Sequence, residues 1–470
     1  MTKIKKNFVL EGLEVVDTST EGKAIAKHDG MVVFIEGAVP GDVVDVMVHR
    51  KKNNLAEGKV HKIIKLSDLR TKPVCEHFGT CGGCKWQNLQ YKSQLEFKQK
   101  YVYDAFTRIG KLTFDEITPI LGNADEYYYR NKLEFGFSNK KWLTNEQIAS
   151  KEEVENKNGL GYHIAGLFDK ILDIHNCYLQ PEPSNSIRNA VKEYALKNNL
   201  SFFGIRDKVG LLRTLLIRTT SIGEIMVVVS VFEWQEKEVF ALLDFLKERF
   251  PQITSLQYTH NPKGNDTFFG LDIKTYYGRD HILEEIEGLK FKISAKSFYQ
   301  TNSQQAYNLY KITRDLAKLT GTELVYDLYT GTGTIANFVA KQAKQVIGIE
   351  YVEDAIKDAV ENSKANNISN TLFFAGDMKD VLNREFISKH GKPDVIITDP
   401  PRAGMSEDVV KVILNTLPKI IVYVSCNPST QARDLALMES HYVIKKVMPV
   451  DMFPQTAHVE NVVLLELKAL

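Results

Sequence analysis

The chain of 470 residues has no long hydrophobic run, although 43% of its residues are hydrophobic and 25% are charged, as in ordinary globular proteins. No stretch approaches the roughly 20 consecutive apolar residues that a membrane-spanning helix needs. The start, Met1–Asn7, is basic, but no apolar core long enough for a secretory signal follows it. The sequence therefore predicts a soluble, cytoplasmic protein without a membrane partner.

An excess of charge of one sign is also missing, since the net charge is +1. Bulk electrostatics therefore do not indicate nucleic-acid binding, but they do not exclude it, because such binding depends on a local basic face. The first 72 residues contain 13 Lys and Arg against 10 Asp and Glu, which is a small basic excess at this end of the chain.

Cysteine is scarce, and only five residues of this type are present. Clustered cysteines in a cytoplasmic protein bind metal more often than they form disulfides. Three cysteines lie within ten residues and a fourth stands apart, and this set can surround either a tetrahedral zinc ion or a 4Fe-4S cluster. The four are Cys75, Cys81, Cys84 and Cys177. Spacing alone favours zinc. The fifth cysteine, Cys426, ends an apolar run.

Residues 1–66 contain several short β-branched runs separated by turn signals at Gly22 and Pro40–Gly41. This pattern predicts a small closed barrel of the oligonucleotide-binding type. Such a barrel either presents a surface to nucleic acid or only separates other domains, and the pattern leaves both interpretations open.

Residues 67–290 mix strand patterns, such as Leu211–Arg218, with helical patterns, such as Glu236–Arg249. We expect a separate α+β domain here, in which Cys177 folds back to meet the first three cysteines. An amphipathic helix is predicted from about Tyr91 to Ile109 by apolar residues at helical spacing, which are Leu95, Tyr101, Tyr103 and Phe106.

The run from Tyr127 to Lys132 combines three tyrosines with an arginine and a lysine. Single-stranded RNA is bound by side chains of both kinds, because bases stack on aromatic rings and cations meet the phosphates. A strand with one buried and one solvated face has the same composition, so both interpretations stay open.

In residues 291–470, strand-like runs alternate with helical stretches through most of the length. This alternation predicts a doubly wound, mostly parallel sheet. The expected strands are Leu324–Leu328, Val346–Ile349, Leu372–Phe374, Val395–Thr398, Ile420–Val424, Tyr442–Val447 and Val462–Leu467. Ligands of such sheets bind beyond the carboxyl ends of the strands, so the residues that follow each strand are the candidates for a site.

Polar residues follow the first three of these strands. Gly331 and Gly333 form a turn that lets the backbone approach a ligand at a helix N-terminus. Glu350 ends the second strand, 19 residues beyond Gly331, where a carboxylate can accept hydrogen bonds from ribose hydroxyls. Asp377 follows the third strand. Each residue alone has a structural explanation, but together they favour a nucleoside cofactor.

The fourth and fifth strands end in reactive side chains. Asp399 precedes Pro400 and Pro401, which fix the chain in an extended form that can aim the carboxylate at a flat substrate. Cys426 precedes a helix that starts near Ser429, and a helix N-terminus favours a thiolate. A lone cysteine is more often a buried structural residue, but its place at the strand end favours a nucleophile.

Four motifs together resemble the RNA uracil-C5 methyltransferases. They are Phe-Tyr-Gln-Thr-Asn at 298–302, Asp-Pro-Pro-Arg at 399–402, Ser-Cys-Asn-Pro at 425–428 and Asp-Met-Phe-Pro-Gln-Thr-Ala-His-Val-Glu at 451–460. The cysteine spacing and the N-terminal barrel, which is similar to a TRAM domain, point to the iron–sulfur branch typified by enzymes of large-subunit ribosomal RNA. The resemblance covers nearly the whole chain and implies a Rossmann-like class I methyltransferase domain at 291–470.

The resemblance implies a covalent mechanism with S-adenosylmethionine as the methyl donor. Cys426 would add to C6 of uracil, Glu460 would remove the C5 proton, and Asp399 would hydrogen-bond the uracil edge. The expected cofactor site comprises Gln300, Tyr329, Gly331, Thr334, Glu350, Asp377 and Asp399. By the same resemblance, the four clustered cysteines hold a 4Fe-4S cluster with a structural role instead of zinc.

Three alternatives remain open. The same reaction on transfer RNA is one, and an RNA-binding iron–sulfur protein without activity is another. An amino methyltransferase that uses the Asp-Pro-Pro loop would leave Cys426 unexplained. The sequence departs from many relatives at Thr330 and Gln431, with unknown effect on substrate choice. We expect a monomer.

Overall fold

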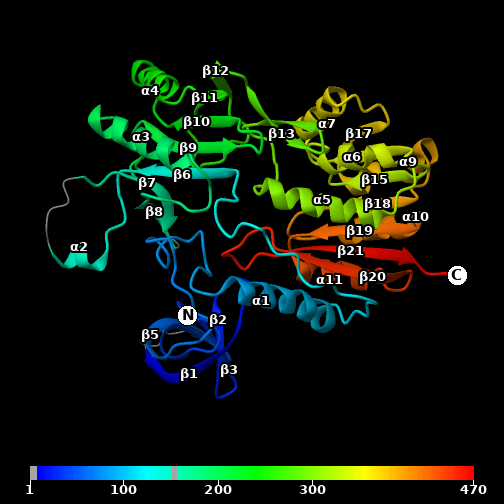
Figure 1. The fold of residues 1–470 in the computed structure, drawn as a ribbon, viewed down its shortest axis with the longest axis horizontal. Coiled ribbons are helices and arrows are strands. Elements are labelled where there is room, and N and C mark those ends of the chain that lie inside the picture. The colour runs from blue at the N-terminus through cyan, green and yellow to red at the C-terminus, as the bar shows by residue number, and fades with distance from the viewer. Residues whose placement is uncertain (1–7, 151–155, 165, 470) are drawn as a thin grey trace.

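The computed structural model describes residues 8–150, 156–164 and 166–469. It consists of a small N-terminal barrel, a central α/β part and a C-terminal α/β part, and the barrel lies near α1 (Figure 1). Within the described residues, no helix is both long and apolar enough to cross a lipid bilayer.

Five strands in the order β1-β2-β3-β5-β4 close the N-terminal barrel. They are β1 (Phe8–Thr18), β2 (Ala24–His28), β3 (Met31–Glu36), β4 (Val43–Lys52) and β5 (Leu55–Lys65). Alternate side chains of β3, such as Val33 and Ile35, are fully buried inside it, as the two-residue period of a strand requires. The barrel expected from the sequence is therefore confirmed.

A seven-stranded sheet with the order β12-β11-β10-β9-β6-β7-β8 forms the central part. Its strands are β6 (Lys132–Ser138), β7 (Gly159–Ile164), β8 (Leu167–Asp173), β9 (Leu212–Thr219), β10 (Ile225–Val231), β11 (Ser255–His260) and β12 (Ile273–Gly278). Its helices are α2 (Asn145–Ala149), α3 (Ser184–Lys197) and α4 (Glu236–Arg249). Val191 of α3 and Leu243 of α4 join the core of this sheet, so the expected α+β architecture is confirmed.

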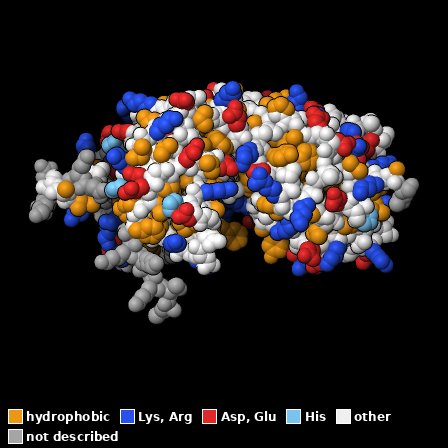
Figure 2. All heavy atoms as spheres, turned by 90° about the horizontal axis from the view of Figure 1, so that it is seen from below, with side chains coloured by type: hydrophobic (Ala, Val, Ile, Leu, Met, Phe, Trp, Pro, Cys, Tyr) orange, Lys and Arg blue, Asp and Glu red, His pale blue; other side chains and the backbone are white. Residues whose placement is uncertain are grey.

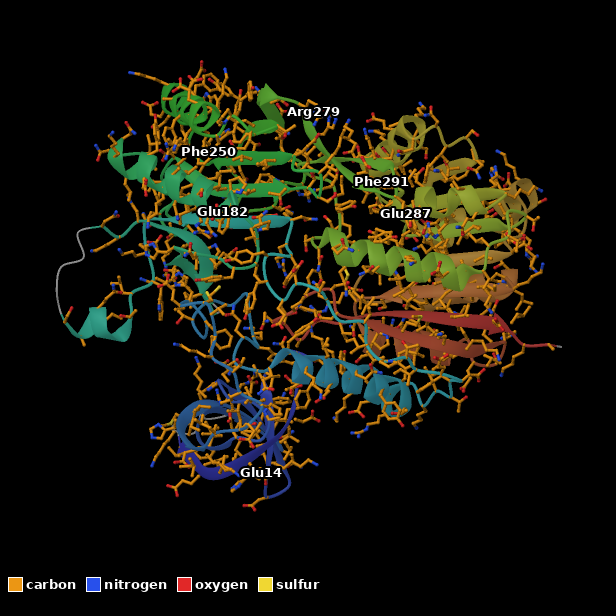
Figure 3. The ribbon with its side chains drawn as sticks, in the orientation of Figure 1. Glu14, Glu182, Phe250, Arg279, Glu287 and Phe291 are labelled. Carbon is orange, nitrogen blue, oxygen red and sulfur yellow. The ribbon has the colours of Figure 1, made fainter. Side chains whose placement is uncertain are left out.

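A two-stranded hairpin, β13 (His281–Ile286) and β14 (Leu289–Ser294), leads from the central sheet to α5 (Ser303–Ala317). Glu287 occupies its turn (Figure 3) and accepts two hydrogen bonds from the guanidinium of Arg314, at 2.6 and 3.1 Å, and one from Tyr307 at 3.0 Å. Phe291 of β14 is buried in the core of the C-terminal part. The hairpin is therefore fixed to the C-terminal part.

The C-terminal sheet has the order β17-β16-β15-β18-β19-β21-β20. The strands are β15 (Leu324–Leu328), β16 (Gln345–Glu350), β17 (Thr371–Ala375), β18 (Val395–Thr398), β19 (Ile420–Ser425), β20 (Tyr442–Val450) and β21 (Glu460–Leu467). The first five strands are parallel to one another, whereas β21 runs antiparallel to both β19 and β20. The expected doubly wound, mostly parallel sheet is confirmed.

Helices cover both faces of this sheet. They are α5, α6 (Thr334–Val339), α7 (Glu353–Ala365), α8 (Met378–Val381), α9 (Arg384–His390), α10 (Glu407–Thr416) and α11 (Pro428–Ala436). Leu309 of α5 and Phe338 of α6 belong to the core on one face, and Ile413 of α10 and Leu435 of α11 to the core on the other.

Helix α1 (Tyr91–Asp104) and the segment after it also pack on the C-terminal sheet. Isolated bridges join this segment to β20 at Phe114–Ile444 and Leu121–Val450. This packing crosses the expected boundary of the domain at 67–290, and the boundaries themselves stay predictions. The helix also differs from its expected apolar pattern, because its buried side chains include Gln94 and Lys98.

Candidate active site

Cys426 follows β19 at the carboxyl edge of the C-terminal sheet, as expected. Asn427 caps the next helix, α11, by accepting a hydrogen bond from the backbone N–H of Ser429 at 3.1 Å. The thiol is half-buried, so it remains accessible from the edge of the sheet. The strand therefore ends with a thiol that a substrate can reach.

The surroundings of Cys426 raise its pKa to about 11. Burial is the main cause, the carboxylates of Glu460 and Asp399 add to it, and Arg402 acts in the opposite direction. The expectation that the helix start favours the thiolate is therefore wrong for the protein without substrate, because desolvation and two acidic neighbours outweigh the helix dipole.

Glu460 and Asp399 lie beside Cys426 because three strands meet at one edge. Asp399 follows β18, and Glu460 begins β21, whose next residue pairs with Ser425. Burial, together with repulsion from Asp399, raises the pKa of Glu460 to about 8. Burial and Asp327 raise the pKa of Asp399 to about 7. Both carboxyl groups can therefore exchange protons near neutral pH.

Asp327 is a buried acid that the sequence analysis did not assign to the site. It is 1% exposed, burial raises its pKa to about 7, and Thr330 donates a hydrogen bond to its Oδ2 at 2.5 Å. Its Oδ1 has no hydrogen-bond partner among the described residues. An acidic residue inside an otherwise apolar strand, directly before the glycine turn, was the signal that could have identified it.

The glycine turn and the end of β16 form one unit. The backbone N–H of Gly331 donates to one carboxylate oxygen of Glu350 at 3.2 Å, and that of Val352 donates to the other at 3.0 Å. Gly331 and Gly333 have φ values of 55° and 74°, which glycine adopts without strain. The carboxylate is fixed in place yet keeps free lone pairs, so it fits the hydroxyls of a ribose.

Tyr329 follows β15 and lies near Glu350, at the end of β16, and Asp377, just after β17. Its pKa is raised to about 12 by burial first and then by nearby carboxylates, which include Asp377 and Glu350. Asp377 also caps α8 by accepting from the backbone N–H of Lys379 at 3.2 Å. These three expected cofactor residues therefore share one location, and their mixture of ring and carboxylates fits a nucleoside.

The other expected cofactor residues lie on neighbouring segments. Thr334 begins α6, and its hydroxyl is 3.3 Å from that of Thr332. Gln300 lies between β14 and α5, where its carbonyl accepts a hydrogen bond from Asn131 at 2.9 Å. The structure therefore ties Gln300 to the central part of the chain.

The four clustered cysteines line one cavity of about 150 Å³, so Cys177 does meet the first three. Burial raises the pKa of Cys81 to about 11 and that of Cys84 to about 12. Among the described residues, no group of three or more His, Cys, Asp or Glu has the arrangement that would hold a metal ion. The four cysteines therefore share the lining of one cavity.

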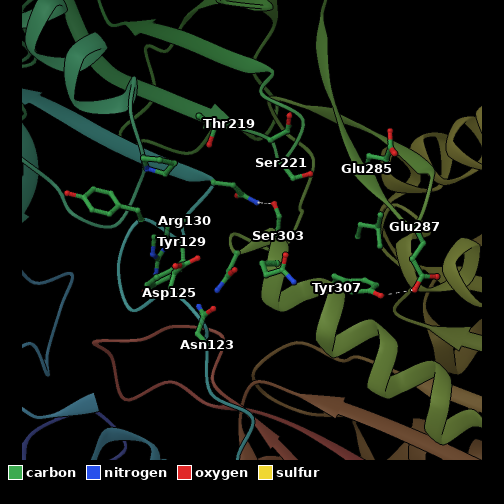
Figure 4. A pocket seen from close by; sticks show the side chains of 17 residues that line it. Asn123, Asp125, Tyr129, Arg130, Thr219, Ser221, Glu285, Glu287, Ser303 and Tyr307 are labelled. Atoms are coloured by element: carbon green, nitrogen blue, oxygen red, sulfur yellow. Dashed lines mark hydrogen bonds between the residues drawn. The ribbon is translucent and has the colours of Figure 1, made fainter. Parts of the chain in front are cut away.

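The aromatic and basic run at 127–132 borders a larger hollow of about 470 Å³ between the central part and α5 (Figure 4). Its lining includes Tyr129, Arg130 and Ser303. Strand β6 starts only at Lys132, so most of the run is not part of a strand. Arg130 also borders the cysteine cavity, and its guanidinium lies 5.1 Å from the ring centre of Phe453.

Comparison with known proteins agrees with this geometry. Residues 271–468 match the family described as tRNA (Uracil-5-)-methyltransferase, and residues 13–61 match the TRAM domain. An RNA methyltransferase of Bacteroides thetaiotaomicron is 59% identical, with 96% of this chain and 100% of that protein covered. The chain belongs to the RNA uracil-C5 methyltransferase family. It is thus an S-adenosylmethionine-dependent enzyme that acts on RNA.

Two further proteins support this membership. An RNA methyltransferase of Chlorobaculum tepidum is 38% identical over 99% of this chain and 97% of its own length. The crystal structure of Pyrococcus abyssi tRNA (uracil-54, C5)-methyltransferase in complex with S-adenosyl-L-homocysteine is similar, with a TM-score of 0.75, 28% identity and coverage of 96% of this chain and 100% of that one.

Proposed function

We propose that this methyltransferase forms 5-methyluridine in large-subunit ribosomal RNA through a covalent bond between Cys426 and uracil C6. The observation that carries the reaction is the convergence of Cys426, Glu460 and Asp399 at one sheet edge. The cysteine cavity supports the ribosomal substrate, because the cysteine set resembles that of the ribosomal branch. The similarity to the Pyrococcus abyssi enzyme favours transfer RNA as the second candidate.

The first step makes uracil C5 nucleophilic. The sulfur of Cys426 forms a bond to C6 as its thiol proton passes to the neighbouring carboxylate of Asp399, and the electron pair of the C5–C6 double bond moves toward O4 as an enolate. Asp399, with a pKa of about 7, carries a proton for part of the time and can donate a hydrogen bond to the charged oxygen. S-adenosylmethionine, when bound, supplies the methyl group that C5 takes up.

The second step restores the aromatic ring. The carboxylate of Glu460 takes the proton from C5, the electrons of that bond re-form the C5–C6 double bond, and the C6–sulfur bond breaks to return the thiolate. The pKa of Glu460 near 8 makes it a stronger base than an ordinary carboxylate. The thiolate of Cys426 leaves as the product forms, so the enzyme is regenerated.

Cys75, Cys81, Cys84 and Cys177 line a common cavity of about 150 Å³. Four thiolates are the ligands that a 4Fe-4S cluster takes. The apolar side chains of Leu133 and Ile174 also line this cavity. We propose that these cysteines hold a 4Fe-4S cluster that supports the structure and takes no part in methyl transfer.

RNA would contact the barrel and the hollow beside the central part, and we expect a monomer to do so. Tyr128 is 49% exposed and lies in the hollow's lining together with Arg130, so a ring and a cation are available to RNA. Figure 2 shows Lys and Arg side chains near the middle of the face seen from below, among scattered acidic residues. A local basic region can attract RNA although the net charge is only +1.

The covalent mechanism is tested with RNA that contains 5-fluorouridine, because fluorine at C5 blocks proton removal and stops the reaction at the adduct. The intact enzyme with S-adenosylmethionine should form a stable protein–RNA complex, and Cys426→Ala should not. A complex formed by Cys426→Ala would exclude this nucleophile.

The substrate is tested by mapping 5-methyluridine in ribosomal and transfer RNA from a deletion strain. Loss from large-subunit ribosomal RNA is expected, and loss confined to transfer RNA would favour the second candidate. The cluster is tested by iron and zinc analysis of anaerobically purified protein. Iron should be lost in Cys84→Ala and kept in Cys426→Ala, whereas stoichiometric zinc without iron would contradict the cluster.

A further inference from the structure

Helix α1 buries a polar face against the C-terminal part. Tyr91, Gln94, Lys98 and Tyr101 follow one another at intervals of three, four and three residues, which places them on the same side of a helix. A helix that packs on a sheet ordinarily turns an apolar stripe toward it. Here each of the four side chains has a polar partner in a segment that carries a candidate catalytic residue.

One end of this face contacts the segment after Cys426. The hydroxyl of Tyr101 donates to Oδ1 of Asn427 at 3.3 Å and lies 3.1 Å from the hydroxyl of Ser429. Asn427 is the cap of α11, so Tyr101 meets the turn that presents the thiol. This contact is on the nucleophile side of the active site.

The other residues contact the loop 451–459, which joins β20 to β21 and ends at Glu460. The ammonium of Lys98 donates to Oδ1 of Asp451 at 2.5 Å, and the hydroxyl of Tyr91 donates to Oδ2 at 2.8 Å. The side chains of Lys98 and Asp451 are both 0% exposed. The first residue of the loop is therefore fixed by a buried ion pair from α1.

Gln94 and Gln455 form a reciprocal pair in the middle of this loop. Nε2 of Gln94 donates to Oε1 of Gln455, and the backbone N–H of Gln455 donates to Oε1 of Gln94, both at 2.9 Å. Gln455 has a φ of 67°, a left-handed conformation that is unfavourable for a residue with a side chain. Surrounding contacts must hold such a residue in place.

Gln455 also contacts the segment that follows Cys84. The carbonyl of Gln455 accepts hydrogen bonds from the backbone N–H groups of Lys85 and Trp86, at 2.8 and 3.1 Å. Lys85 directly follows Cys84, and Trp86 packs with Ala457 of the loop in a small apolar core. Gln455 thus connects the cysteine cavity, α1 and the loop that leads to Glu460.

We propose that Gln94 and Gln455 are positioning residues that hold Glu460 for removal of the C5 proton, and that they link the order of the cysteine segment to this step. The proposal rests on the proposed function. Glu460 acts only after the methyl group has been transferred, while Cys426 lies on a different strand. Loosening this pair should therefore slow release of the product from Cys426 more than formation of the adduct.

The experiment compares Gln94→Ala with Gln99→Ala. Gln99 is a glutamine of the same helix whose Nε2 donates to the carbonyl of Thr118 at 3.0 Å, away from the loop. Trapping on 5-fluorouridine RNA reports adduct formation, and single-turnover release from ordinary RNA reports proton removal. In Gln94→Ala, trapping should stay within about twofold while release slows by on the order of 10- to 100-fold, so that the adduct accumulates. Gln99→Ala should leave both rates within about twofold.

Hydrogen exchange supplies a readout that does not depend on turnover. Backbone amides of 453–460 should exchange faster in Gln94→Ala than in the intact protein or in Gln99→Ala. A second variant, Gln455→Gly, keeps the backbone conformation without strain but removes one bond of the pair. It should slow release in the same selective way if the variant folds with an unchanged melting temperature.

Each outcome decides the proposal. The proposal would be overturned if Gln94→Ala slowed trapping and release equally. It would also be overturned if neither Gln94→Ala nor Gln455→Gly slowed release. Failure of the intact enzyme to trap would refute the covalent mechanism instead, and the exchange of 453–460 would then still decide whether Gln94 holds the loop. Faster exchange in Gln99→Ala to the same degree would show that α1 acts only as general support.

Discussion

Replacing Glu460 by Gln should stabilise the protein at alkaline pH while it abolishes turnover. Burial raises the pKa of this carboxyl from 4.5 to about 8. The folded protein therefore keeps a proton that the unfolded chain has released, and the free energy of unfolding falls as the pH rises from about 4.5 to about 8. Glutamine is similar in size to protonated glutamate and does not titrate, so the variant escapes this loss.

The size of the effect follows from proton linkage. Each pH unit between the unfolded and folded pKa values lowers the free energy of unfolding by about 1.4 kcal/mol. Between pH 6 and pH 9, the free energy of unfolding of the intact protein should therefore fall by about 2–3 kcal/mol more than that of Glu460→Gln. Urea denaturation of both proteins at the two pH values measures the difference, provided that circular dichroism and fluorescence give coincident transitions.

A matched control is available on the same strand. The side chain of Glu466 is 31% exposed and pairs with Lys318, so Glu466→Gln should change the stability by less than about 0.5 kcal/mol. The argument would be refuted if the free energies of unfolding of the intact protein and Glu460→Gln differed by the same amount at both pH values. Glu460 would then not bind a proton in the folded state near neutral pH.

Lys98→Met should lower the free energy of unfolding by about 3–5 kcal/mol, since it leaves Asp451 charged and buried; adding Asp451→Asn should restore much of the melting temperature, and no restoration would contradict the pairing. Gly333→Ala should weaken binding of S-adenosylhomocysteine about tenfold in calorimetry, because its φ is 74° and its Cβ would lie 2.8 Å from that of Ala359. A Cβ at Gly331 would have no neighbouring heavy atom within 4 Å, so Gly331→Ala should weaken binding of S-adenosylhomocysteine less. Single-turnover release should rise with pH between 6 and 8 as the base that removes the C5 proton ionises; a flat profile would exclude that role.

The sequence predicted the C-terminal sheet closely, because parallel buried strands have distinctive apolar runs. The expected strands at 324–328 and 395–398 have the bounds that the structure shows. Asp399 and Cys426 could also be expected to meet, since residues that follow neighbouring parallel strands share one edge. The pKa of Cys426 could not be derived, because its burial and its acidic neighbours depend on tertiary packing.

The polar face of α1 could not be predicted from sequence patterns either, because its partners are set by tertiary packing. Lys98 and Asp451 are 353 positions apart, so nothing in the local sequence shows that a lysine on a helix has a buried partner. Periodicity indicated only which side of the helix is apolar. The buried Asp327 had a local signal, a charge within an apolar strand, although the sequence analysis did not assign it to the site.

The topology explains why Glu460 needs support that Asp399 and Cys426 do not. The two latter residues follow β18 and β19, whose parallel pairing fixes where each strand ends. Glu460 instead begins an antiparallel strand, and the nine residues before it, 451–459, cross the edge of the sheet outside any strand. The position of the base at this edge is therefore set partly by what holds that loop. Buried polar contacts from α1 and from the cysteine segment perform this task, which explains why a loop of a methyltransferase domain is tied to residues some 350 positions earlier in the chain.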